Sequence, residues 1–174
     1  RYEAGDKEST ESTETTTDKF RTKNSSPSNT VVVKAKQAPY NFVTRTQIQS
    51  LVEGFSAKQG HTSVKSKLVS SYAWDTAIAF IQKTNNDYGN SSEEGNYSGR
   101  LKLTGETTAV NNIYDMGGNV WERTTGECSS TEYPYSMRGG NYFSNDFDSY
   151  PAGHRASDDD RAYDNVGFRL TLFF

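Results

Sequence analysis

The sequence contains almost no cysteine, and this excludes several kinds of site. Cys128 is the only cysteine in 174 residues. The chain can therefore form neither an intrachain disulfide nor a zinc site built from several cysteines. We expect Cys128 to be a small side chain in a loop or in the core, with a reactive thiol as the alternative.

Long apolar runs and blocks of one charge are missing as well. No stretch approaches the roughly 18 to 20 apolar residues of a membrane span, and no signal peptide is visible, so we expect a soluble chain without membrane insertion. Nineteen basic and 22 acidic residues give a net charge of −3, and no Lys/Arg-rich block occurs. Nucleic acid is therefore not expected as a partner. The sequence begins at Arg1 without a methionine, and we expect residues upstream, with any localisation signal, to be missing.

Hydrophobic residues make up only 32% of the chain, which predicts a small core or one diluted by loops. The length fits a single domain over residues 1–174. Residues 6–30 contain one aromatic among Ser, Thr, Glu, Lys and Asn, and this composition predicts a flexible insertion. Eleven tyrosines and nine phenylalanines indicate packing on aromatic rings and also suit a recognition surface.

Two amphipathic helices are predicted in the first half of the chain. Residues 44–47 have the form of a capping box, in which Thr44 and Gln47 satisfy unpaired amides at a helix start. The first apolar stripe is formed by Ile48, Leu51, Val52 and Phe55, with Gly60 as the stop. The second helix is predicted to begin at Ser70 and Ser71 and to carry Trp74, Ala77, Ile78 and Ile81.

The remaining segments predict short strands and loops. Val31–Val33 is a β-branched run that indicates a strand. Residues 85–99 have no usable period and predict a loop. Residues 112–174 are rich in Gly, Tyr, Asp and Asn, with only short apolar runs. Two helices followed by a loop-rich β region predict an α+β domain.

Three motifs in the last third of the chain carry a family resemblance. They are Asn112-Ile-Tyr-Asp-Met-Gly-Gly-Asn-Val-Trp-Glu122, Met137-Arg-Gly-Gly-Asn-Tyr142 and Val166-Gly-Phe-Arg169. In this order and spacing they resemble the formylglycine-generating-enzyme (sulfatase-modifying-factor) family, whose fold is of the C-type-lectin kind. The residues expected to hold the scaffold are Trp121, Arg138, Gly139, Gly140, Gly167, Phe168 and Arg169.

The resemblance also implies a calcium site in the first motif. By position, Asp115 and Glu122 would supply carboxylates, and Gly118 and Val120 would supply backbone carbonyls. Such an all-oxygen set suits Ca²⁺, whose role here would be to fix the loops. The alternative is that both carboxylates cap turns or lie in solvent.

The resemblance does not extend to the family's catalysis. Formylglycine-generating enzymes use two copper-binding cysteines after the Arg-Gly-Gly motif, whereas residues 141–155 contain none. Serine lacks the soft, readily deprotonated sulfur that copper(I) needs, so no copper is expected. We therefore expect a non-catalytic protein, with an oxidase working through Cys128 as an alternative.

The residue alphabet at the C-terminus is restricted. Residues 138–174 contain no Lys, Glu, Gln, Met or Trp, although the first 137 residues contain thirty of them. About eight would be expected by proportion. Asn codons randomised at their adenines cannot produce these five types, so residues 141–165 are compatible with such diversification. In this the chain resembles the variable proteins of diversity-generating retroelements; the alternative is an ordinary Gly/Asp/Tyr-rich loop region.

The sequence thus predicts a binding module on a phage virion or bacterial cell surface that recognises a protein or glycan receptor through a loop region at 138–174. Tyrosine and phenylalanine would give rigid contact area, and Asn, Asp and Ser adaptable hydrogen bonds. The exposed candidates are Tyr142, Ser144, Asn145, Phe147, Tyr150, His154, Asp158, Asp159, Tyr163 and Asp164. A structural prophage tail or filament subunit, with residues 6–30 as an assembly arm, is a further alternative.

Overall fold

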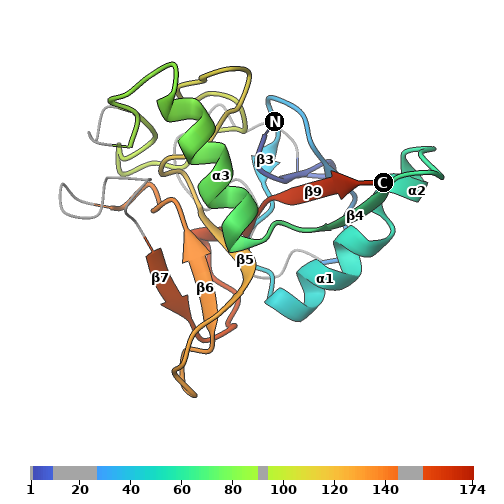
Figure 1. Ribbon diagram of the computed structural model, residues 1–174. Helices are drawn as coiled ribbons and strands as arrows, with labels where there is room; N and C mark the ends of the chain where they lie inside the picture. Colours follow the sequence, from blue (N-terminus) through green and yellow to red (C-terminus); the bar gives the residue numbers. More distant parts are fainter. Residues whose placement is uncertain (1, 10–26, 90–93, 145–154) are drawn as a thin grey trace.

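A four-stranded sheet organises the C-terminal half of the protein (Figure 1). The computed structural model describes residues 2–9, 27–89, 94–144 and 155–174. The strand order is β7-β6-β5-β8, with β5 and β8 parallel and the other pairs antiparallel. The strands are β5 (Trp121–Glu127), β6 (Tyr135–Arg138), β7 (Arg155–Asp158) and β8 (Val166–Phe168).

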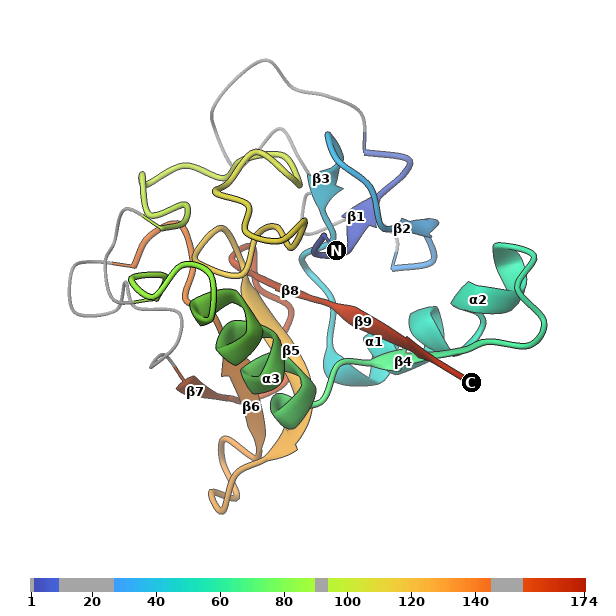
Figure 2. The ribbon, with the colours of Figure 1, turned by 45° about the horizontal axis from the view of Figure 1, so that its top comes forward.

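Two smaller sheets and three helices complete the part of the chain that the structure describes (Figure 2). In one sheet, β1 (Gly5–Asp6) lies between β2 (Val31–Val32) and β3 (Ala38–Pro39). In the other, β4 (Lys65–Leu68) pairs with β9 (Leu170–Phe173). The helices are α1 (Arg45–Glu53), α2 (Phe55–Lys58) and α3 (Ser71–Gln82). The predicted α+β class is confirmed.

The start of α1 is fixed by the predicted capping box. Gln47 N donates to the Thr44 hydroxyl, and Thr44 N donates to the Gln47 side chain at 2.9 Å. The helix ends earlier than predicted, with Gly54 as its C-cap, and a separate short turn of helix, α2, follows. Gly60, the predicted stop, lies after α2 with a φ of 82°. The break at Gly54 was missed because the apolar stripe continues through it to Phe55, which is also buried.

Helix α3 packs on the sheet through one large aromatic. Its N-cap is Ser70, as predicted, and Trp74 is 1% exposed. The indole Nε1 of Trp74 donates to Glu122 on β5 at 2.7 Å. Because a buried indole N–H needs an acceptor, this bond fixes the helix against the central strand. Ile78 and Ile81 are also buried, whereas Ala77 is only partly so.

Both ends of the predicted insertion pair with each other. Asp6 belongs to β1, and its carboxylate accepts hydrogen bonds from Ser9 and Asn29. Lys7 N donates to the carbonyl of Thr30 at 3.0 Å. The first and last residues of the segment 6–30 therefore form the base of a hairpin between β1 and β2, while 10–26 lie outside the described residues.

Candidate functional site

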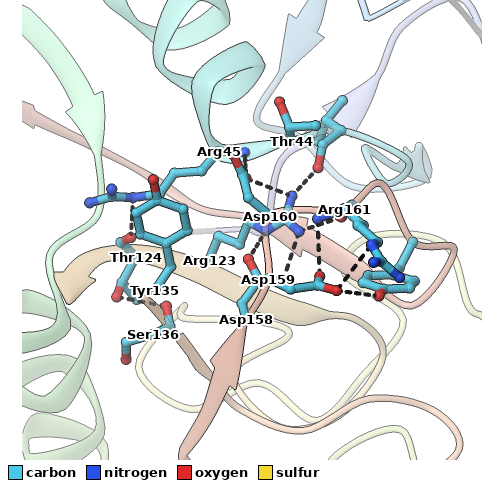
Figure 3. Close-up of polar contacts among 12 residues, drawn as sticks. Thr44, Arg45, Arg123, Thr124, Tyr135, Ser136, Asp158, Asp159, Asp160 and Arg161 are labelled. Atoms are coloured by element: carbon cyan, nitrogen blue, oxygen red, sulfur yellow. Dashed lines mark hydrogen bonds and ion pairs between the residues drawn. The ribbon is translucent and has the colours of Figure 1, made fainter. Parts of the chain in front are cut away.

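A buried ion pair lies beneath the connection between β7 and β8 (Figure 3). Arg123 on β5 is fully buried, and its Nε and Nη2 donate to the two carboxylate oxygens of Asp158 at 2.6 and 2.9 Å. The same guanidinium donates to the carbonyls of Val43 and Arg161. A buried guanidinium is tolerated when a carboxylate and further acceptors satisfy it, as they do here. The turn after β7 is therefore bonded directly to the central strand.

Asp160 ties the same turn to helix α1. It has a φ of 64°, and its carboxylate accepts a hydrogen bond from the backbone amide of Arg45, the first residue of α1. An acceptor with negative charge at a helix N-terminus satisfies an unpaired amide and favours the helix dipole. The turn is thus fixed from two sides, by the sheet through Asp158 and by α1 through Asp160.

Polar and aromatic side chains lie on the outer side of this turn. We call Tyr133, Asp159, Arg161 and Tyr163 the outer patch. Asp159 accepts from the Tyr163 hydroxyl at 3.0 Å and pairs with the guanidinium of Arg161 at 3.3 Å. The Arg161 side chain is 79% exposed, and the two tyrosines are 41% and 38% exposed. These side chains offer a mixed aromatic and charged surface to solvent.

Desolvation and local hydrogen bonds move the pKa values of two groups of the outer patch further from neutral pH. Desolvation acts against the charge of Asp159, but hydrogen bonds from the Arg161 amide and the Tyr163 hydroxyl outweigh it and lower the pKa of Asp159. Desolvation, together with the bond to Asp159, raises the pKa of Tyr163. At neutral pH the outer patch therefore presents an aspartate anion beside an un-ionised tyrosine.

Beside the outer patch, Arg45 lies over the ring of Tyr135 on β6, with Cζ 4.3 Å from the ring centroid. Its guanidinium also donates to the carbonyls of Thr124 and Thr125. This cation–π contact joins the first residue of α1 to strand β6.

Two of the predicted ligand contacts are not exposed. Tyr142 is completely buried, and its hydroxyl donates to Asp164 at 3.1 Å. Asp158 is 2% exposed because it is the partner of Arg123. The expectation that these residues face solvent is therefore wrong. Composition alone could not separate them from exposed neighbours, since burial depends on partners far away in the sequence.

The other predicted contacts fall into three groups. Asp159 and Tyr163 belong to the outer patch. Asp164 is part-buried, and Ser144 is also part-buried, with its hydroxyl accepting from the Asn141 amide at 3.0 Å. Those outside the described residues are Asn145, Phe147, Tyr150 and His154. Sequence reasoning missed Tyr133 and Arg161; Arg161 lies inside the segment 141–165 and could have been included on that ground.

Comparison with known proteins shows the family to which the chain belongs. The family model described as "Sulfatase-modifying factor enzyme 1-like domain" matches residues 1–172. The chain belongs to this family. A search of the curated proteins finds no match.

Two solved structures share the fold of this family member. The structure titled "Crystal Structure of CarF" aligns with a TM-score of 0.61 and 14% identity, over 76% of this chain and 66% of that one. The structure titled "Treponema denticola variable protein 1" aligns with a TM-score of 0.50 and 15% identity, over 80% of this chain and 71% of that one. The chain thus spans about two thirds of the length of CarF, and both likenesses concern the fold.

Asp115, expected from the family resemblance as a calcium ligand, is bonded to protein donors. It is 1% exposed; its Oδ2 accepts from the Gly105 amide at 2.8 Å and its Oδ1 from the Thr107 hydroxyl at 2.7 Å. Both carboxylate oxygens therefore have protein partners, and Asp115 serves to close the loop that precedes it.

Glu122, the second expected carboxylate, is equally occupied. It is 1% exposed and accepts from Trp74 Nε1 at 2.7 Å and from Arg169 Nη2 at 2.6 Å. Arg169 also donates to the carbonyl of Asp115 at 3.1 Å. A guanidinium thus already supplies positive charge here, and these side chains do not fit a calcium site. In the described part of the chain, no group of three or more His, Cys, Asp or Glu side chains is arranged to hold a metal ion.

Gly118 and Val120, the expected carbonyl ligands, have packing roles. Gly118 has a φ of 69°, and a Cβ there would lie 2.2 Å from the carbonyl oxygen of Asn96, so no side chain fits. Val120 is 1% exposed in a small cluster with Tyr142 and Leu101.

The expected scaffold residues are all buried. Trp121 is 9% exposed and packs with Met137 and Val166. Phe168 is completely buried, with its ring edge-on to Tyr40. Gly139 and Gly140 both have positive φ, and a Cβ at Gly167 would lie 2.9 Å from Val120. Arg138 pairs with Asp75 on α3 at 3.2 Å, which joins the Arg-Gly-Gly motif to the helix.

Proposed function

We propose that this protein is a non-catalytic ligand-binding module that recognises a protein or glycan receptor through its C-terminal third. In this proposal it is displayed on a phage particle or bacterial cell surface. The observation that carries the proposal is the outer patch, in which exposed tyrosine and arginine side chains surround the partly buried Asp159 on and beside a turn fixed by the buried Arg123–Asp158 pair.

A fixed backbone with variable side chains is what a recognition surface needs. Tyrosine offers large contact area with few rotatable bonds, and aspartate and arginine add directional hydrogen bonds. The bonds that hold the turn come from Asp158, Asp160 and backbone groups. Asp159, Arg161 and Tyr163 bond mainly to one another, so these three positions can change without removing the support beneath them.

We further propose that the segment 141–165 is diversified by a retroelement. The absence of Lys, Glu, Gln, Met and Trp after Met137 supports this, and the fold shared with a protein titled as a variable protein is compatible with it. The test is to sequence the same locus in sibling isolates. We expect substitutions at Asp159, Arg161 and Tyr163 and an unchanged Arg123. An invariant 141–165 segment with variation upstream would overturn the proposal.

An oxidase of the formylglycine-generating type is the second candidate, because the family model is named for an enzyme. The chain has one cysteine where that chemistry is expected to use two, and Cys128 donates to the carbonyl of Tyr135 at 3.3 Å. The test is to incubate the protein with copper and a cysteine-containing peptide. We expect no aldehyde product; turnover that is lost in Cys128→Ser would establish the enzyme and remove the first proposal.

A further inference from the structure

A polar pocket of about 510 Å³ lies between α3 and the strands β5, β6 and β7. It is on the opposite face of the sheet from the Arg123–Asp158 pair, because side chains alternate along a strand and Ser157 precedes Asp158. Its lining includes Ser71, Tyr72, Asp75, Arg138, Arg155 and Ser157. A helix normally packs on a sheet through apolar side chains, so this row of hydroxyl and charged groups is unusual.

Each oxygen of the carboxylate in the pocket already accepts a hydrogen bond. Asp75 Oδ1 accepts from Arg138 Nε at 3.2 Å, and Oδ2 accepts from Arg155 Nη2 at 3.1 Å. Two guanidinium groups share this single carboxylate, so positive charge exceeds negative charge immediately around Asp75. Among the described residues that line the pocket, the other acid is Glu127, which is exposed at the rim, where water screens its charge as it does that of the exposed Arg155.

Two hydrogen-bond donors of the pocket remain available to a ligand, one on Ser136 and one on Arg155. The Ser136 hydroxyl oxygen accepts from Arg138 Nη1, so its own proton is free to point elsewhere. Arg155 is 61% exposed, and its bridge to Asp75 uses one of its five N–H donors. An exposed bridge of this kind contributes little to stability, so Arg155 can turn toward a ligand at small cost.

The pocket is also held in shape before any ligand arrives. Ser71 and Thr124 share a hydrogen bond of 2.7 Å that joins the first turn of α3 to β5. A Cβ at Gly126 would lie 2.3 Å from the Ser71 oxygen, so only glycine allows this approach. Arg138 is 7% exposed and fixed by three acceptors. Because this frame is already ordered, binding needs to order little besides Arg155.

We propose that this pocket binds a sugar acid, with the carboxylate of the ligand on Arg155 and the Ser136 hydroxyl. An available guanidinium and an available hydroxyl donor favour a carboxylate, which is an acceptor only. The ring of Tyr72, 86% exposed at the rim, supplies an apolar face on which a sugar ring can stack.

The test is a titration of the ¹⁵N-labelled protein followed by NMR, with glucuronic acid as probe, glucose as neutral match and acetate as carboxylate alone. We expect saturable shifts of the Ser71, Tyr72 and Arg155 amides with glucuronic acid, and at least tenfold weaker binding of glucose and acetate. Arg155→Ala and Tyr72→Ala should each weaken binding about tenfold or more.

Matched controls come from the outer patch. Arg161→Ala removes an exposed arginine that is also paired with an aspartate, and Tyr133→Ala removes an exposed tyrosine; both should leave the affinity for glucuronic acid unchanged. The absence of saturable shifts, equal binding by acetate, or unchanged affinity in Arg155→Ala would overturn the inference. Any of these results would leave the proposed function of the outer patch standing, since the latter is tested by variation at the locus.

Discussion

Arg123 is the residue on which the outer patch depends most. Its guanidinium is fully buried and bonds to Asp158, Val43 and Arg161. Arg123→Ala would leave the Asp158 carboxylate buried and unpaired, and we expect it to lower the free energy of unfolding by about 3–5 kcal/mol. Urea denaturation checks this, with the exposed Arg161→Ala as control at about 0.5 kcal/mol or less. A loss below about 1 kcal/mol for Arg123→Ala would contradict the structural role of the pair.

A substitution of Asp115 tests whether this side chain is a calcium ligand, as the family resemblance implies. Asp115→Ala leaves the Gly105 amide and the Thr107 hydroxyl without their acceptor, and we expect a loss of about 1–3 kcal/mol. Because protein donors occupy the carboxylate, the loss should be the same with calcium and with a chelator. The measurement is thermal unfolding in both buffers, with the exposed Asp87→Ala as control. If the Tm of the parent protein falls when a chelator is added, the calcium site is supported after all.

The buried carboxyl group of Glu3 should make the stability of the protein fall as the pH rises. Burial, together with the negative charges of Asp115 and Glu122, raises the pKa of Glu3 well above its ordinary value of 4.5. The folded protein therefore binds this proton more tightly than the unfolded chain does. The resulting stability is complete below pH 4.5 and is lost as the pH rises through the folded-state pKa.

The variant that tests this is Glu3→Gln, which keeps an oxygen for the Asn119 side chain, the present hydrogen-bond donor to Glu3. We expect its free energy of unfolding, measured by denaturation from pH 4 to pH 9, to fall less steeply with pH than that of the parent. The variant should be the more stable protein at the alkaline end. Parallel pH profiles for the two proteins would show that Glu3 does not carry the effect.

For the helices and strands, the sequence predicts features that depend on neighbouring residues but not pairings between segments far apart in the chain. The starts of α1 and α3 follow from caps within a few residues, Thr44 with Gln47 and Ser70 with Ala73. The pairing of β4 with β9 joins the first half of the chain to its end, and no short-range pattern encodes it. The same limit applied to the site: composition indicated Asp159 and Tyr163, but only strand pairing brings Tyr133 near them and buries Asp158.

Helix α1 gives a prediction at this scale, since its first turn is capped from two sources. Thr44 supplies the local cap, and Asp160 accepts from the Arg45 amide across the fold. We expect Thr44→Ala to cost about 1 kcal/mol and the double variant with Asp160→Ala to cost more than either alone. Urea denaturation measures both, and Thr46→Ala, an exposed position in the same turn, is the control. A double variant no less stable than Thr44→Ala would show that Asp160 does not cap α1.

For the whole molecule, the arrangement separates the residues that support the fold from those that face solvent on the outer patch. The triple variant Asp159→Ala, Arg161→Ala, Tyr163→Ala removes the mutual bonds of the patch but none of the bonds to Asp158 or Asp160. We therefore expect the free energy of unfolding to change by at most about 1–1.5 kcal/mol, a shift of roughly 2–6 °C in Tm. Calorimetry measures this change, and Arg123→Ala in the same buffer gives the loss of stability expected when a supporting residue is removed. Should the triple variant unfold as readily as Arg123→Ala, the patch would belong to the supporting structure, and a surface that must vary could not be built on it.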